Sequence, residues 1–399
     1  MLKHCNACNL PETYETLEFD EKGTCNICTQ KKFKDEIVDW PDRKKQLDRL
    51  IEMHQGKYDY DCLIPFSGGK DSTYTLYFLI KEYKLKPLVV QFNHGFMRRG
   101  LLQNNERTFK KLGVDVLSFT PNWHVVKRLM LESLVRKGDF CWHCHTGIYS
   151  YPMQVALEKR IPLIFWGEPS SEYTAYYDYR DNQIEEVDEI KFNRSTNLGI
   201  TAEDMAGMIS GDFPLDPRDL KPYRYPPLRE LKKLGYRSVC LGSFISWDVK
   251  KHVEIIQKEL GWQGDQVEGM PWDLYPYEKI ECYMQGVRDY IKYLKRGYGR
   301  VTQMTALDLR NGRISMAKAQ DLIKSFEGKK PPSLAIFLEY LGITEDEFNR
   351  IIRKTVVPPH IPDFSASEAP KTSDFSSWYR EAPENQGIQK GKTKALQKP

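Results

Sequence analysis

One short segment of the chain combines residue types that can hold phosphate groups. Ser67-Gly68-Gly69-Lys70-Asp71-Ser72 lies between an apolar run and a segment with helical apolar spacing. Adjacent glycines let the backbone approach a ligand closely and adopt dihedral angles closed to other residues. The N–H groups of such a turn and the N-terminus of the following helix form a positive cradle for phosphate oxygens. The segment therefore predicts a phosphate-binding turn.

The side chains of this turn suit the same chemistry. Ser67 and Ser72 can donate hydroxyl hydrogen bonds, and Lys70 supplies a positive charge. Asp71 belongs beside phosphates if it binds Mg²⁺ or orients Lys70, so Lys70 and Asp71 are the predicted catalytic pair. The simpler interpretation is a Gly-Gly turn that only starts a helix, with Ser72 as its cap. The string differs from the Gly-x-x-x-x-Gly-Lys-Ser/Thr loop of kinases.

Four cysteines near the start have the spacing of a metal site. Two Cys-x-x-Cys pairs, Cys5 with Cys8 and Cys25 with Cys28, are separated by sixteen residues. Two such pairs supply the four soft ligands that tetrahedral structural zinc requires. A unit of this size has too little core to fold unaided, so we expect the metal to hold it together.

A third pair, Cys141 and Cys144, is followed directly by His145. Two ligands, or three with the histidine, do not complete a metal site. The pair is therefore interpreted either as a metal or cluster site or as two small buried side chains.

The elements that must position these residues alternate between strand and helix. Strands are predicted at 61–66, 87–92, 114–119, 162–166 and 237–241, and helices around 47–54, at 72–85 and at 124–137. This alternation predicts an α/β fold with a doubly wound parallel sheet covered on both faces. A long insertion, roughly 170–235, separates the last two strands. Beyond it helices are predicted at 278–295, 315–326 and 333–341.

Length and composition fit an ordinary globular protein of two or three domains. The 399 residues predict a zinc-ribbon-like unit at 1–45, a nucleotide domain at 46–270, a helical region at 271–357 and a disordered tail at 358–399. The net charge of +4 is too mild for a dedicated nucleic-acid binder. No apolar run of roughly 18 residues and no signal-peptide core are present, so a cytoplasmic protein without a membrane partner is expected.

The phosphate-binding turn resembles the pyrophosphate loop of the PP-loop ATP pyrophosphatase superfamily, whose fold is HUP-like. That resemblance implies adenylation: a substrate oxygen attacks the α-phosphate of ATP, pyrophosphate leaves, and a nucleophile then displaces AMP. In such sheets the ligand lies at the carboxyl ends of the strands. Asn93, Gly167 and Glu168 follow two of the predicted strands and are therefore expected near the nucleotide, although ordinary turn chemistry explains them equally well.

The chain as a whole resembles the N-acetyl sugar amidotransferases of bacterial surface-polysaccharide biosynthesis over about residues 1–330. The resemblance is carried by the N-terminal cysteine pairs and by the segments 141–147, 163–167, 241–248, 295–300 and 308–315. It implies that ATP activates the acetamido oxygen of a nucleotide-linked sugar and that ammonia replaces it, giving an acetamidino group. It also implies ATP, Mg²⁺ and structural Zn²⁺, and a separate glutaminase partner, often with a cyclase-like protein.

The sequence indicates less clearly which residues would contact the nucleotide-linked sugar. Arg296, Arg300, Arg310 and Arg313 suit phosphate groups because arginine binds phosphate in a bidentate manner, but each could equally be a solvated surface residue. Asp248 is assigned to the site and the neighbouring Trp247 to the core. The chain departs from its relatives after Arg313, where it continues Ile314-Ser-Met-Ala-Lys, and in the tail after Pro358.

Two other functions are compatible with parts of the sequence. A PP-loop tRNA thiolase would share the turn and the zinc unit and would use Cys141 and Cys144 with Cys240 as a third ligand. A non-enzymatic ATP-binding adaptor would need neither Lys70 nor Asp71. The mild charge and the segments after residue 240 favour the amidotransferase.

Overall fold

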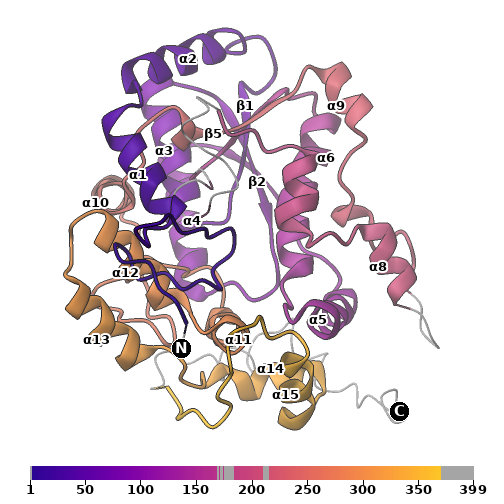
Figure 1. Ribbon diagram of the computed structural model, residues 1–399. Coiled ribbons are helices and arrows are strands. Elements are labelled where there is room, and N and C mark those ends of the chain that lie inside the picture. The colour runs from indigo at the N-terminus through magenta and orange to yellow at the C-terminus, as the bar shows by residue number, and fades with distance from the viewer. Residues whose placement is uncertain (1, 169, 171–173, 175–183, 210–214, 370–399) are drawn as a thin grey trace.

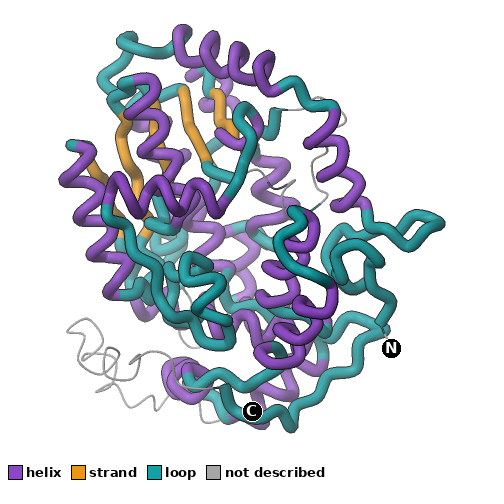
Figure 2. Tube along the Cα trace, turned by 90° about the vertical axis from the view of Figure 1, so that its left-hand side faces the viewer, coloured by secondary structure: helices purple, strands orange, loops and turns teal. Residues whose placement is uncertain are grey.

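The core of the molecule is a five-stranded parallel sheet. The computed structural model describes the chain except residues 1, 169, 171–173, 175–183, 210–214 and 370–399. The strands are β1 (Cys62–Pro65), β2 (Pro87–Phe92), β3 (Asp115–Phe119), β4 (Leu163–Trp166) and β5 (Arg237–Cys240). They pair in the order β3-β2-β1-β4-β5 and lie side by side in Figure 2. The strand order reverses between β1 and β4, which is where such sheets bind ligands.

Helices cover both faces of this sheet, as Figure 1 shows. Side chains alternate along each strand, so Ile64 and Val89 pack on α3 (Lys70–Tyr83) and α10 (Val249–Leu260). Leu63 and Leu88 point to the opposite face and pack on α6 (Trp142–Glu158). The predicted doubly wound α/β sheet is confirmed.

The remaining helices surround this centre. Before β4 they are α1 (Asn26–Glu36), α2 (Trp40–Glu52), α4 (Arg99–Leu112) and α5 (Trp123–Lys137). The described parts of the 170–235 insertion contain α7 (Glu189–Lys191), α8 (Ala202–Met208) and α9 (Leu228–Leu234). The C-terminal region forms α11 (Gln285–Arg296), α12 (Arg300–Arg310), α13 (Met316–Phe326), α14 (Ser333–Leu341) and α15 (Glu345–Arg353). Most of the tail predicted at 358–399 lies outside the described residues.

The C-terminal helices pack around a second apolar core. These helices lie beneath the sheet in the view of Figure 1. Phe337 on α14 is fully buried between Phe140, at 4.6 Å between ring centroids, and Phe348 on α15. Leu134 of α5 belongs to the same cluster. This core therefore joins the C-terminal region to the sheet domain and is not a separate body of apolar contacts.

The small N-terminal unit docks on this C-terminal region too. Tyr14 packs against Tyr298 with ring centroids 4.9 Å apart, and Ala306 of α12 is buried among the N-terminal cysteines. The N-terminal unit thus packs on the C-terminal region, and α12 lies between the cysteine unit and the rest of the molecule.

One predicted helix is shorter in the structure than in the sequence analysis. The helix expected at 278–295 begins only at Gln285, and residues 278–284 form an irregular turn with Lys279 in the left-handed region at φ +52°. Non-glycine residues seldom adopt this conformation. The correction is important because this turn, called here the 278–284 turn, forms part of the candidate site.

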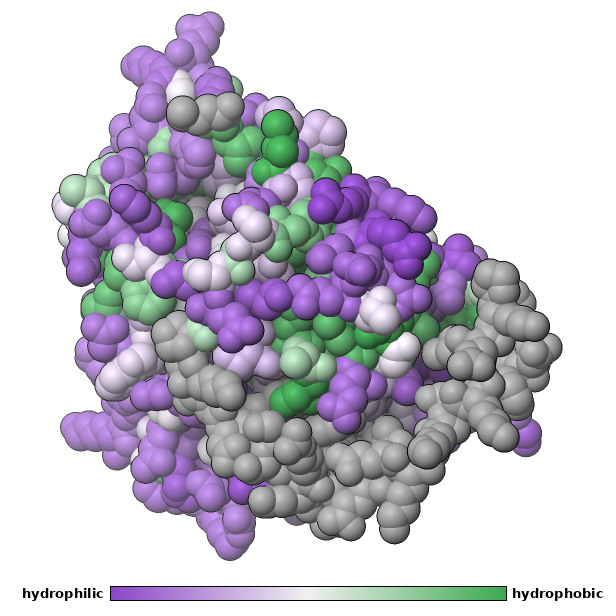
Figure 3. Space-filling model, turned by 90° about the horizontal axis from the view of Figure 1, so that it is seen from below, coloured by the Kyte–Doolittle hydropathy of each residue, from purple (hydrophilic) through white to green (hydrophobic). Residues whose placement is uncertain are grey.

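No helix among the described residues is long and apolar enough to cross a bilayer. On the face seen in Figure 3, apolar side chains come to the surface in patches between hydrophilic ones. Isolated surface apolar residues of this kind are ordinary in folded proteins.

The packing of α14 gives a direct test of the joint core. Phe337→Ala removes a fully buried ring and should lower the free energy of unfolding by about 3–5 kcal/mol. Val135→Ala, at a side chain that is 48% exposed, is the matched control and should change it by less than about 0.5 kcal/mol. Urea denaturation followed by circular dichroism measures both. Equal effects of the two substitutions would contradict the packing described.

Candidate active site

The Ser67–Ser72 turn leaves the end of β1 in a tightly held conformation. Gly68 has φ +86°, and a methyl group there would also overlap the side-chain amide of Asn105. The backbone oxygen of Gly68 accepts a hydrogen bond from the Trp262 indole at 3.2 Å, and its N–H donates to Ser72 Oγ at 3.1 Å. Glycine is therefore required at this position both for its dihedral angles and for space.

The turn passes directly into α3, whose first turn presents backbone N–H groups without partners inside the helix. Gly69 is the N-cap, and its own N–H donates to Ser67 Oγ at 3.2 Å. The carboxylate of Glu281, from the 278–284 turn, fills the space that a side chain at Gly69 would need. The phosphate-binding turn is thus faced closely by the C-terminal region.

A cavity of 330 Å³ opens beside this turn. Its sheet side is formed by the carboxyl ends of β1, β2 and β4, where Ser67, His94 and Glu168 line it. Asp71, Ser72 and Gly167 line it as well. Its opposite wall comes from the C-terminal region, including Lys279, Glu281, Cys282 and Arg288. The volume falls in the range of small-molecule sites, and the location is the switch point of the sheet.

Lys70 does not line this cavity, although its partner Asp71 does. Its buried ammonium lies 2.8 Å from Asp71 Oδ2 and 2.9 Å from Glu278 Oε2. Burial opposes ionisation of Glu278, but Lys70 and its neighbouring cations hold the pKa of that carboxyl at about 2. Lys70 therefore joins the turn to the C-terminal region, while Asp71, which also accepts a hydrogen bond from Trp247 Nε1 at 3.3 Å, lines the cavity.

The cavity wall carries several groups that are neutral at pH 7. Burial lowers the pKa of His94 and of His143 to about 4 and that of His145 to about 3. Burial, with the negative charge of Asp71 nearby, raises the pKa of Glu168 to about 7. The imidazoles are thus uncharged, but the ring nitrogens of His143 face the carbonyls of Phe140 and His94 at 3.3 Å, and His94 Nδ1 accepts from the Phe96 N–H at 3.3 Å. Glu168 can hold or release a proton near neutral pH.

Three thiols line the same cavity. Cys141 and Cys144 are joined there by Cys282, and burial raises the pKa of all three, that of Cys282 to about 12. The third cysteine anticipated from the sequence was Cys240, but the structure places it at the end of β5, where it does not line the cavity. Cys282 was missed because its segment was assigned to a helix.

Other predicted site residues lie outside the cavity wall. Asn93 caps its own turn, accepting from the Gly95 N–H at 2.9 Å. Arg296 donates to the Thr13 carbonyl at 2.6 Å, and Arg300 pairs with Glu278 and Asp289 at 3.5 and 3.6 Å.

Three further predicted residues, Asp248, Arg313 and Arg310, lie at helix ends or beside the cysteine unit. Asp248 caps α10 and pairs with Arg313 at 2.7 Å. The half-buried Arg310 lies near Cys8 and Cys28. In this structure these groups anchor one part of the fold to another.

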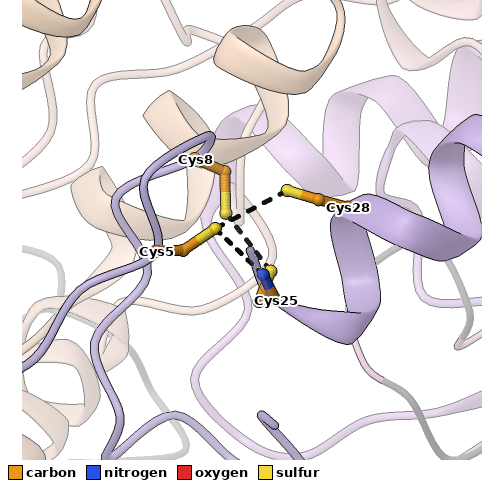
Figure 4. Close-up of side chains that lie close together, drawn as sticks. All are labelled: Cys5, Cys8, Cys25 and Cys28. Atoms are coloured by element: carbon orange, nitrogen blue, oxygen red, sulfur yellow. Dashed lines mark hydrogen bonds between the residues drawn. The ribbon is translucent and has the colours of Figure 1, made fainter. Parts of the chain in front are cut away.

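The four N-terminal cysteines converge, as Figure 4 shows. Their sulfur atoms lie within 4.8 Å of one another, with 3.6 Å between Cys8 and Cys25 and 3.9 Å between Cys5 and Cys28. Tetrahedral zinc with bonds of about 2.3 Å to sulfur would separate the sulfur atoms by about 3.8 Å. The cluster therefore fits a metal ion, and α1 begins directly at its third ligand.

The sheet order and the turn after β1 define a doubly wound parallel α/β protein with a glycine turn at the switch point of its sheet, joined by a four-cysteine unit and a helical C-terminal region. Residues 275–371 match the family model for the LPS biosynthesis protein WbpG-like, C-terminal domain. The predicted relationship to surface-polysaccharide biosynthesis is thereby confirmed for this region. The matched region begins just before the 278–284 turn, so it supplies the C-terminal wall of the cavity.

Two further similarities are more distant. The uncharacterized protein MJ1599 of Methanocaldococcus jannaschii is 25% identical over 146 residues, which are 35% of this chain and 50% of that protein. The chain thus matches about half the length of this relative. The U34-tRNA thiolase NcsA from Methanococcus maripaludis, solved with its 4Fe-4S cluster, aligns over 92% of this chain and 94% of its own at 12% identity, with a TM-score of 0.28. A TM-score this low carries no argument about the fold, which is defined here by the order of the strands in the sheet.

The four-cysteine cluster gives a prediction about metal content. Cys25→Ser removes one ligand and should reduce bound metal well below one ion per chain and lower the thermal midpoint. Cys62→Ser, at a buried thiol in β1 outside the cluster, should keep the metal. Elemental analysis of the purified proteins measures this. Full metal content in Cys25→Ser would show that the cluster is not the metal site.

The conformation of the turn gives a second prediction. Gly68→Ala and Gly56→Ala both place alanine at a positive φ, of +86° and +72°, but only Gly68 also lacks space for a methyl group. We expect Gly56→Ala to cost about 1 kcal/mol of unfolding free energy and Gly68→Ala clearly more. Urea denaturation of the two variants measures the difference. Equal losses would mean that Asn105 does not restrict this position.

Proposed function

We propose that this chain is an ATP-dependent, AMP-forming amidotransferase that converts the acetamido group of a nucleotide-linked N-acetyl sugar into an acetamidino group. The reaction would serve O-antigen or related lipopolysaccharide synthesis in the cytoplasm. The observation that carries the proposal is the joint cavity, since the region similar to a lipopolysaccharide-biosynthesis domain faces a phosphate-binding turn across it.

The residues of the turn would hold the phosphates of ATP. Backbone N–H groups at the start of α3 and the Ser67 and Ser72 hydroxyls can donate to phosphate oxygens. The carboxylates of Asp71 and Glu281 border this place and can serve as ligands of the Mg²⁺ that accompanies ATP. The amide oxygen is a poor leaving group. Bound ATP would supply the adenylyl group that makes this oxygen part of a phosphate ester.

The opposite part of the cavity suits an uncharged acetamido group. The neutral imidazole of His145 can hydrogen-bond an amide, and the neutral rings of His94 and His143, held by backbone groups, do not repel the cationic amidine product. Glu168 changes its charge near pH 7 and can take up a proton when ammonia attacks and AMP leaves. These groups match a reaction that begins with a neutral amide and ends with a cationic amidine.

Ammonia would come from a separate glutaminase subunit, of the kind that the resembled family combines with a cyclase-like protein. We recognise no glutaminase Cys–His arrangement in this sequence, and the cavity thiols carry raised pKa values that oppose nucleophilic attack. A partner that releases ammonia therefore fits the composition of the site better than hydrolysis of glutamine here.

Sulfur transfer by a thiolase-like reaction is the second candidate. One observation favours it: Cys141, Cys144 and Cys282 line the same cavity as the phosphate-binding turn. A thiolase predicts iron or labile sulfur on these cysteines and AMP formation that depends on tRNA. The amidotransferase predicts AMP formation that depends on an acetamido sugar.

The first experiment combines both possibilities. The protein is incubated with Mg²⁺-ATP, ¹⁵N-ammonium and a panel of nucleotide-linked N-acetyl sugars, and mass spectrometry follows the sugars, AMP and pyrophosphate. A sugar in which oxygen is replaced by labelled nitrogen, with one AMP per product, is the expected result. A parallel reaction contains tRNA in place of sugars. AMP formed only in that reaction would replace the amidotransferase by the thiolase.

A further inference from the structure

The cavity has two cations on its wall, and the lysine of the phosphate-binding turn is neither of them. Among the described residues the cationic side chains that line it are Lys279 and Arg288. Lys70 is enclosed by Asp71 and Glu278, each within 2.9 Å, so its charge is already balanced before any phosphate arrives. The positive charge that faces a phosphate chain must therefore come from elsewhere.

Of the two cations on the wall, Arg288 belongs to the thiol end. It lies near Asp139, Cys141 and Cys144, and Asp139 supplies it with a negative charge. Lys279 lies on the 278–284 turn, whose Glu281 fills the space beside Gly69, and its charge acts on both Glu168 and His145. Lys279 is thus the cation on the same side as Asp71 and the carboxyl end of β4.

The ammonium of Lys279 is uncommitted within the described part of the chain, where it forms neither a hydrogen bond nor an ion pair. The residue before it, Glu278, is fully buried and bonded to Lys70 and Arg300. The residues after it are held as well, because the Tyr283 N–H donates to the Phe96 carbonyl at 2.9 Å. The backbone before and after Lys279 is therefore held in place, while the side chain of Lys279 remains available to a ligand.

The backbone of Lys279 is in an unfavourable conformation. Its φ of +52° costs a non-glycine residue on the order of 1 kcal/mol, and such strain is retained where the surroundings impose it. Here the imposing contacts are the ion pairs of Glu278 and the hydrogen bond of Tyr283. The strain accompanies a turn of the backbone that brings the side chain of Lys279 to the cavity while Glu278 stays on Lys70.

We propose that Lys279 is a catalytic residue whose ammonium binds the β- and γ-phosphate oxygens of ATP and neutralises pyrophosphate as it leaves, while Lys70 positions the turn. This assignment rests on the proposed function. The substrate oxygen forms a bond to the α-phosphorus, the bond from that phosphorus to the bridging oxygen breaks, and its electron pair stays on pyrophosphate. The added negative charge lies beside Lys279, and no proton transfer by the lysine is required.

Binding of the product tests this role without knowledge of the sugar. The probes are Mg²⁺-pyrophosphate and AMP, measured separately by isothermal titration calorimetry on the full chain. Lys279→Gln removes the charge and leaves a polar side chain one atom shorter, and should weaken pyrophosphate binding about 10- to 100-fold. Its affinity for AMP should change less than about threefold, a selectivity that general structural damage does not produce. Lys279→Arg keeps the charge and should recover most of the pyrophosphate affinity.

Lys110→Gln is the matched control, because this lysine lies on α4 with a side chain that is 75% exposed. It should bind both probes as the natural chain does. Unchanged pyrophosphate affinity in Lys279→Gln, or equal losses for pyrophosphate and AMP, would overturn the assignment. Because no sugar takes part, this result is separate from the labelled-ammonium experiment, and either can fail while the other succeeds.

Discussion

The buried contact between Lys70 and Glu278 is the interaction on which the rest of the site depends. Both side chains are removed from water, and each balances the charge of the other together with one further partner, Asp71 for Lys70 and Arg300 for Glu278. Removing one partner of such a pair typically costs about 3–5 kcal/mol. One partner belongs to the phosphate-binding turn and the other to the C-terminal region, 208 residues apart by their numbers. The turn therefore keeps its shape only when the C-terminal region is in place, and the cavity exists only between them.

The same contact connects the cysteine cluster to the site. Glu278 also pairs with Arg300 at the start of α12, and α12 packs against the N-terminal unit through Ala306 and the nearby Tyr298. Arg310 at the other end of α12 lies beside the cluster. A metal ion held by the four cysteines would stabilise the platform on which Arg300 rests. Its contribution to function is thus expected through position, because the cluster lies outside the wall of the cavity.

The sequence analysis succeeded where structure follows local pattern. The five strands, the turn after β1 and the four-cysteine cluster each depend on residues close together in the chain, and all are present in the structure. It was less successful where ion pairs between residues far apart in the chain determine the local conformation. Helical periodicity extended the helix of α11 back to residue 278, but the pairing of Glu278 with Lys70 imposes a turn there. Arginines that suit phosphates in a sequence, such as Arg300, prove to be bound to carboxylates, which spacing alone does not reveal.

The distribution of charge within the cavity bears on which substrate it accepts. Asp71, Glu281 and Lys279 bring formal charges to the end beside the Ser67–Ser72 turn, whereas the other end carries neutral imidazoles and thiols together with Arg288, which faces Asp139. Under the proposed function, the first end would receive metal and phosphate charges, because opposite charges are already arranged there. At the second end the charge of Arg288 is balanced by Asp139, so this end offers hydrogen bonds with little net charge, which favours a neutral group that becomes charged only during the reaction. An acetamido group has this property, and a substrate with a permanent charge at its reacting atom does not.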